Sequence, residues 1–317
     1  LVGGDLLTTL AEPQLRIGQE KFELKTESSI SLGENTDIDG VSNLTLLNFS
    51  LFEGENNNPI VSFDRLAVAE LEGRGGKTIG VKEILTAGFK SSISGNFPLA
   101  VDIPEIKVSN IFTEDLATFT VSELNLQRSI ITAVQNSELL VRLDGLSVNN
   151  ISLADGGKVG VENVRLQNFA FLGSRDESAN KTAVSFGDAT LNKISWGSDG
   201  GFKGDTLHFD DLVASVIRDK DGTINITRQL AEMQLGDQQG TKPVAPPAKK
   251  VAVKESQGTP FRLEKIVVAG KSAVFFEDYT LAVPYVTDLN ISRLEVTGLD
   301  SSKPGQKTKI LLEGELE

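Results

Sequence analysis

The stretch that decides the fold is Val161-Glu162-Asn163-Val164-Arg165-Leu166-Gln167-Asn168-Phe169-Ala170-Phe171-Leu172. Apolar and polar side chains largely alternate along it, and a period of two is typical of a β-strand with one buried face. A similar stretch begins at Val41, 120 residues before Val161, and reads Val41-Ser42-Asn43-Leu44-Thr45-Leu46-Leu47-Asn48-Phe49-Ser50-Leu51-Phe52. A more divergent copy runs from Asp288 to Val296. We therefore predict a repeated β unit.

The three copies share an unusual spacing of their apolar residues. These residues stand at relative positions i, i+2, i+5 and i+7, and they are Leu44, Leu46, Phe49 and Leu51; Val164, Leu166, Phe169 and Phe171; and Leu289, Ile291, Leu294 and Val296. In a flat strand, the skip of three would turn the second pair to the opposite face. A β-bulge or sharp bend near Asn48, Asn168 and Arg293 would keep all four on one face. The alternative is a strand that is buried on both faces.

The rest of the chain favours antiparallel β-structure. Turn signals such as Asp144-Gly145 and Asp221-Gly222 recur between short alternating segments, and such pairs supply the positive φ that hairpins need. Helical patterns are scarce, and the two we predict run from Asp5 to Ala11 and from Thr227 to Leu235. The predicted fold is mainly β: an elongated repeat of antiparallel strands that form a long, curved and twisted groove-like sheet with one or two short helices.

A segment rich in Pro, Ala and Lys divides the chain. We predict a first β repeat over 1–120, a second over 121–235 that ends in a short helix, a flexible linker over 236–260, and the start of a third, truncated repeat over 261–317. The chain starts at Leu1, and its last residues read as a strand, a turn and the start of another strand. We therefore interpret it as part of a longer protein.

Composition restricts the function classes. The chain has 44 acidic and 31 basic residues and a formal charge of −13, so a nucleic-acid partner is disfavoured. It has no Cys and one His, which excludes disulfides, thiolate catalysis, zinc fingers and multi-His metal sites. No run is long and apolar enough for a membrane span. We predict a protein that is not an enzyme and that needs neither cofactor nor metal.

Two motifs suggest chemistry at first sight. His208 precedes Asp210 and Asp211, but no nucleophile motif accompanies it, and we interpret it as a histidine on a strand face. The run from Asp219 to Ile224 resembles the middle of a calcium loop. The ligand positions on either side of it are filled by Ile217 and Arg228, so a hairpin turn is the better interpretation.

The apolar face is the candidate functional site. It requires cover from a second layer, from helices or from a ligand. The candidate lining comprises the repeat residues and further Phe side chains, namely Leu44, Leu46, Phe49, Leu51, Phe63, Val164, Leu166, Phe169, Phe171, Phe186, Leu289, Ile291, Leu294 and Val296. These residues fit either a trough for lipid tails or the core of an ordinary β-sandwich.

One region resembles a known family. The segments from Phe261 to Gly270, from Ala273 to Tyr279 and from Leu289 to Leu299 are similar to the AsmA-like proteins of Gram-negative cell envelopes, as is Asp221 to Ile226. The closest branch is the long envelope proteins described only as a domain of unknown function. The resemblance is best over residues 205–317 and looser over the earlier repeats.

The resemblance implies a periplasmic protein, usually anchored in the inner membrane by an N-terminal helix that would lie outside this sequence. It implies a long curved sheet whose apolar side shelters acyl chains of phospholipid or another lipid between the inner and outer membranes, with membranes at the ends of the full-length protein. Other envelope proteins are possible partners. The alternative is a structural scaffold for outer-membrane protein biogenesis with a closed apolar core.

Overall fold

The computed structural model describes residues 15–19, 21–31, 37–53, 58–74, 78–93, 98–133, 139–154, 157–172, 182–197, 201–225, 260–303 and 305–317. The strands are β1 (Leu15–Gly18), β2 (Lys21–Ser31), β3 (Asp37–Glu53), β4 (Pro59–Arg74), β5 (Thr78–Ile93), β6 (Leu99–Thr113), β7 (Phe119–Ala133), β8 (Leu139–Ala154), β9 (Lys158–Leu172), β10 (Thr182–Gly197), β11 (Gly201–Asp210), β12 (Val213–Arg218), β13 (Phe261–Ala269), β14 (Ser272–Asp278), β15 (Tyr285–Asp300) and β16 (Lys309–Leu316).

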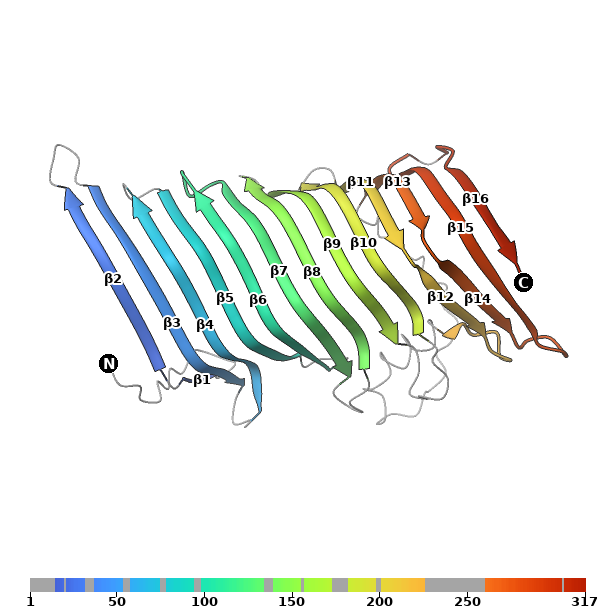
Figure 1. Ribbon diagram of the computed structural model, residues 1–317, viewed down its shortest axis with the longest axis horizontal. Coiled ribbons are helices and arrows are strands. Elements are labelled where there is room, and N and C mark those ends of the chain that lie inside the picture. The colour runs from blue at the N-terminus through green and yellow to red at the C-terminus, as the bar shows by residue number, and fades with distance from the viewer. Residues whose placement is uncertain are drawn as a thin grey trace, which may run out of the picture.

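All of these strands belong to one sheet (Figure 1). From β2 to β11 each strand pairs antiparallel with the next one along the chain, and the curved sheet is one strand thick in Figure 1. This confirms the predicted elongated antiparallel fold. Both predicted helices, 5–11 and 227–235, lie outside the described residues, as does most of the predicted linker. The segments 1–120, 121–235 and 261–317 all contribute strands to the same sheet.

The C-terminal part of the sheet contains two interrupted strands. β11 and β12 follow one another beside β10, with a break at Asp211, and β13 and β14 follow one another with a break at Gly270. β11 pairs with β13 and β12 with β14, both in parallel, whereas β15 pairs antiparallel with both β13 and β14. Both parallel pairs join strands that precede the segment 219–260 to strands that follow it.

The repeat unit is 40 residues long, not 120. Valine recurs every 40 residues at positions 41, 81, 121 and 161, which lie in β3, β5, β7 and β9. It also recurs every 40 residues at positions 61, 101 and 141, which lie in β4, β6 and β8. Each unit is thus one pair of antiparallel strands. β3 and β9 are the two copies whose residues match best, and they are three such units apart. This distance is the offset of 120 residues seen in the sequence.

Two lines of unusual backbone cross the sheet. We call the first line the first crease. Its positive-φ residues are Asn48 (φ 50°), Gly88 (66°), Arg128 (21°) and Asn168 (49°) on successive odd-numbered strands, and Asp211 (57°) in the break between β11 and β12. The second crease has its positive-φ residues on even-numbered strands, at Glu70 (49°), Asn110 (52°), Asn150 (52°) and Lys193 (50°). Positive φ is costly for most residues and is tolerated best by Gly and Asn.

Side-chain contacts accompany the creases. In the first crease, the Asn168 amide donates a hydrogen bond to the Asp144 carboxylate at 3.1 Å. In the second crease, the Asn43 side-chain oxygen accepts a hydrogen bond from the Glu70 backbone N–H at 3.0 Å, and Lys82 pairs with Glu70. These contacts satisfy polar groups at the bends and help to hold the backbone there.

The predicted bends occur, although two of them are not bulges. Asn48 and Asn168 have positive φ, but the ladder on either side of each keeps the same register, so no residue is inserted. Near Arg293 the register between β15 and β16 does shift, between Ile291 and Arg293, as expected for a bulge.

Gly88 offers a test of the first crease. It has φ +66°, and an added Cβ would lie 2.1 Å from the Asp64 carboxylate. We expect Gly88→Ala to lower the free energy of unfolding by about 1–3 kcal/mol, because it adds backbone strain and a clash. The matched control is Gly73→Ala, since nothing lies within 4 Å of its added Cβ. Equal urea-unfolding midpoints for the two variants would show that the crease is not a constrained feature.

Candidate acyl-chain-binding face

Two rows of side chains, which we call the central rows, cross thirteen strands from β2 to β16. Residues in a row are direct cross-strand partners and so share one face of the sheet. The first central row is apolar throughout and consists of Leu24, Leu44, Val68, Ile84, Val108, Leu124, Val148, Val164, Leu191, Leu207, Ile266, Val296 and Ile310. The second contains a single polar residue, Thr86, and consists of Phe22, Leu46, Leu66, Thr86, Ile106, Leu126, Leu146, Leu166, Ala189, Phe209, Val268, Leu294 and Leu312.

A third row, the flanking row, lies beyond the first crease. It also crosses thirteen strands and has one polar member, Ser91, whose hydroxyl donates to the Ile60 carbonyl at 3.1 Å. Its members are Ile17, Leu51, Val61, Ser91, Val101, Ile131, Val141, Phe171, Val184, Ala214, Val274, Leu289 and Leu316.

The structure distributes the candidate lining residues over these rows. Leu44, Val164 and Val296 lie in the first central row, and Leu46, Leu166 and Leu294 in the second. Leu51, Phe171 and Leu289 lie in the flanking row. The other four aromatic candidates form two stacked cross-strand pairs between the rows, Phe49 with Phe63 at 4.7 Å and Phe169 with Phe186 at 4.8 Å between ring centroids. Ile291 is buried opposite Ser272 and Gly314, outside the three rows.

One aromatic contact shows that the apolar face continues across the first crease. Phe186 lies on the flanking side of the crease in β10, whereas Phe209 belongs to the second central row in β11. Their rings meet edge to face, with centroids 5.3 Å apart. Phe186 is three residues from Ala189, the cross-strand partner of Phe209, and in a flat strand the two would face opposite sides. The crease therefore brings both rows to one face, as the apolar spacing predicts.

No described strand covers this face. Every strand pair with extensive contact is a hydrogen-bonded pair within the sheet, so the described residues form no second layer. Most side chains of the rows are half-buried, and of the row members only Ala189 and Val268 are almost completely buried. A closed β-sandwich core would bury many more of them.

Sequence reasoning missed the parts of the rows that lie on β5 to β8. Ile84, Val108, Leu124 and Val148 continue the first central row between the two copies that the 120-residue comparison identified. These strands match the Val41 and Val161 stretches less closely in residue type. The signal that locates them is the 40-residue period, since Ile84 and Leu124 follow Leu44 at intervals of 40.

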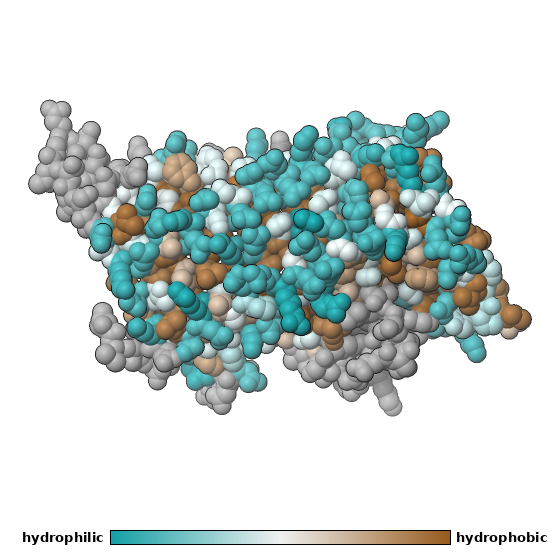
Figure 2. Space-filling model, viewed as in Figure 1, coloured by the Kyte–Doolittle hydropathy of each residue, from teal (hydrophilic) through white to brown (hydrophobic). Residues whose placement is uncertain are grey.

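The opposite face is polar. It is the face in view in Figure 2, where hydrophilic side chains cover most of the middle of the sheet. One row of cross-strand partners on this face consists of Lys107, Asn125, Ser147, Arg165, Thr190 and His208.

Ion pairs within and between strands stabilise charged groups on the polar face. Lys107 pairs with Glu83 at 2.7 Å, and this hydrogen bond raises the pKa of Lys107. Hydrogen bonds from Arg293 and then Lys265 hold the pKa of Glu295 below its usual value. Both shifts favour the charged forms and keep this face hydrated.

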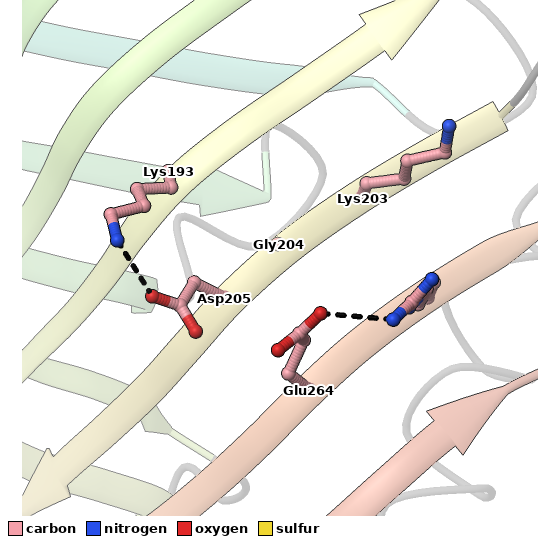
Figure 3. A pocket seen from close by; sticks show the side chains of 6 residues that line it. Lys193, Lys203, Gly204, Asp205 and Glu264 are labelled. Carbon is pink, nitrogen blue, oxygen red and sulfur yellow. Dashed lines mark hydrogen bonds and ion pairs between the residues drawn. The ribbon is translucent and has the colours of Figure 1, made fainter.

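A shallow pocket on the charged surface lies over β10, β11 and β13. Lys193 pairs with Asp205 at 3.4 Å, and Arg262 pairs with Glu264 at 3.0 Å (Figure 3). Lys193 and Arg262 thus each have a carboxylate partner, from the neighbouring strand and the same strand respectively. Lys193 belongs to the second crease, where Lys82 and Glu70 form another exposed ion pair, and we assign no ligand to the pocket.

The two chemical motifs of the sequence have local structural roles. The His208 ring lies 3.1 Å from the Asp210 carboxylate, two residues along the same strand, and both groups are half-buried. Asp219 to Gly222 form the predicted hairpin turn, closed by a hydrogen bond from the Gly222 N–H to the Asp219 carbonyl at 2.8 Å. Within the described ranges, no group of three or more His, Cys, Asp or Glu side chains is placed to hold a metal ion.

Comparison with protein-family models, curated proteins and solved structures finds no match to this chain. In the part of the chain that the structure describes, no helix has the length and apolar character to cross a membrane.

Accessibility of the apolar face can be measured by cysteine labelling, because the chain contains no native Cys. Leu124 and Asn125 are neighbours on β7 that face opposite sides of the sheet, and both are half-buried. We expect Leu124→Cys and Asn125→Cys in delipidated protein to react with a small maleimide at rates within about tenfold of each other. A rate for Leu124→Cys that is lower by several orders of magnitude would show that the apolar face is covered.

Proposed function

We propose that this protein is a non-enzymatic β-groove protein of the bacterial envelope that binds lipid acyl chains on its apolar face and conducts them along the sheet. The observation that carries the proposal is the first central row, which is apolar in every one of its thirteen strands. A sheet face of this kind is stable in water only when something apolar covers it.

The dimensions suit acyl chains. Adjacent strands lie about 4.8 Å apart, so a row that crosses thirteen strands extends about 60 Å. One leaflet of hydrocarbon is about 15 Å thick, so three or four neighbouring strands would shelter one tail. Alternate residues along a strand are about 7 Å apart. We propose that a single hydrocarbon chain lies along the line between the two central rows, which we call the furrow.

The energetics also favour this function. Removing a sixteen-carbon chain from water contributes about 13 kcal/mol, at about 0.8 kcal/mol per methylene. Because the rows present similar aliphatic side chains on successive strands, a tail can advance from one strand to the next without returning to water. Movement of this kind requires no catalytic residue.

The place of action follows from the sequence resemblance to AsmA-like envelope proteins. We propose a periplasmic location for the β-sheet, with the full-length protein anchored in the inner membrane and lipid passing between the inner and outer membranes. The scaffold alternative expects an internally covered apolar face, and no described strand provides that cover.

Lipid retention by matched variants tests the proposal. Val148 lies in the first central row, and its neighbour Ser147 lies in the polar row of the opposite face. We expect the purified wild-type protein to carry phospholipid or another acyl-chain lipid, seen by native mass spectrometry and by solvent extraction. Val148→Asp should lower the bound lipid about tenfold or more, because it places a charge in the furrow, whereas Ser147→Asp should retain it.

Folding of both variants is checked by circular dichroism. If both variants remain folded and retain as much lipid as the wild type, or if the wild type repeatedly carries none, the acyl-chain proposal is wrong. Capture of a protein on the apolar face in place of lipid would favour the scaffold.

A further inference from the structure

The loop between β14 and β15 exposes an unusual apolar segment. Residues 281–286 read Leu-Ala-Val-Pro-Tyr-Val, and no charged residue interrupts them. The exposed fractions are 55 % for Leu281, 78 % for Val283 and 60 % for Val286. We call residues 281–286 the apolar tip. Residues 281–284 of the tip lie in the loop, whereas Tyr285 and Val286 are the first residues of β15. The loop lies at the right-hand corner of the sheet in Figure 1, where Figure 2 also shows hydrophobic surface.

The base of the loop is held firmly. The Asp278 carboxylate accepts hydrogen bonds from the backbone N–H and the hydroxyl of Thr280, at 2.9 and 2.6 Å, and pairs with Arg218 at 3.4 Å. These contacts, those of Thr280 above all, hold the pKa of Asp278 below its usual value. The Tyr279 N–H donates to the Arg218 carbonyl at 2.8 Å. The exposure of the tip therefore arises on an anchored loop.

The apolar tip adjoins the end of the flanking row. Val274 and Leu289 are cross-strand partners in that row, and Phe276 lies on the same face two residues beyond Val274. The Phe276 ring is 6.3 Å from the ring of Tyr285, which belongs to the tip. Apolar surface thus runs from the flanking row through this aromatic pair to the exposed corner.

We propose that the apolar tip inserts into the boundary between the headgroups and the acyl chains of a lipid bilayer. An exposed aliphatic loop with a tyrosine at its edge fits that boundary, where amphipathic rings are favoured and apolar side chains leave water. An inserted tip would join the bilayer to the end of the apolar face. That role rests on the proposed lipid-binding function, whereas insertion itself does not.

The charges around the tip define the type of bilayer. Glu277 and Asp278 precede the loop, and Asp219 and Asp221 lie in the adjacent turn beside Tyr279. The neighbouring cations are Arg218, which pairs with Asp278, and Lys220. Because the acids outnumber the cations, an anionic surface would repel this corner. The preferred bilayer is therefore one of zwitterionic headgroups.

Flotation with vesicles of phosphatidylcholine tests the insertion. The variant Leu281→Asp/Val283→Asp should lower the partition coefficient about tenfold or more, because it places two charges among the headgroups. The control is Leu116→Asp, since Leu116 is 48 % exposed in the turn between β6 and β7 and belongs to none of the rows. Addition of 30 % phosphatidylserine should not strengthen binding of the wild type.

A second measurement keeps insertion separate from lipid carriage. A Val283→Trp variant should show a blue shift of the added fluorescence on mixing with vesicles, relative to the native Trp196. Equal flotation of the double-Asp variant and the wild type would overturn the proposed insertion. Self-association of the wild-type protein through the tip, without vesicle binding, would also overturn it. The two proposals can fail separately. The double-Asp variant should still retain bound lipid, and the Val148→Asp variant should still float with vesicles.

Discussion

The structure depends on the hydrophobic effect acting on one face of a sheet that has no second layer in the described residues. The rows of apolar side chains are continuous because every strand from β2 to β11 pairs in a register that aligns its aliphatic residues with those of its neighbours. A slip of one residue would move these side chains to the polar face. The alternation of apolar and polar residues thus fixes the register and, with it, the continuity of the apolar face.

The two creases make this arrangement compatible with long strands. Strands of about sixteen residues would otherwise accumulate twist, and their apolar residues would have to alternate without interruption. At each crease a residue of positive φ on alternate strands changes the direction of the chain, and the apolar spacing skips by three to match. The contact between Phe186 and Phe209 shows that the face remains common to both sides of the first crease. Backbone strain at the creases is therefore tied to the shape of the apolar face.

Much of the fold could be predicted from local patterns. Alternation indicated antiparallel strands, and the skip in spacing located the bends at Asn48 and Asn168. The 40-residue period is hard to recognise from residue types, because equivalent crease positions share a backbone conformation and not a residue type. Asn48, Gly88 and Arg128 occupy equivalent positions. The parallel pairing of β11 with β13 joins two strands that are not consecutive in the sequence, and no local pattern encodes it. Similarly, the pattern that marks Leu166 or Phe169 as apolar is the same for an open face and a sandwich core.

The central claim is that acyl chains lie along the central rows. The most direct measurement is photocrosslinking with a phospholipid that carries a diazirine on its acyl chain, followed by mass spectrometry of the labelled residues. The account predicts adducts on alternate residues of β7, β8 and β9, with Leu126, Leu146 and Leu166 labelled and Asn125, Ser147 and Arg165 not labelled. Labelling without this alternation, or labelling of the polar face alone, would contradict it.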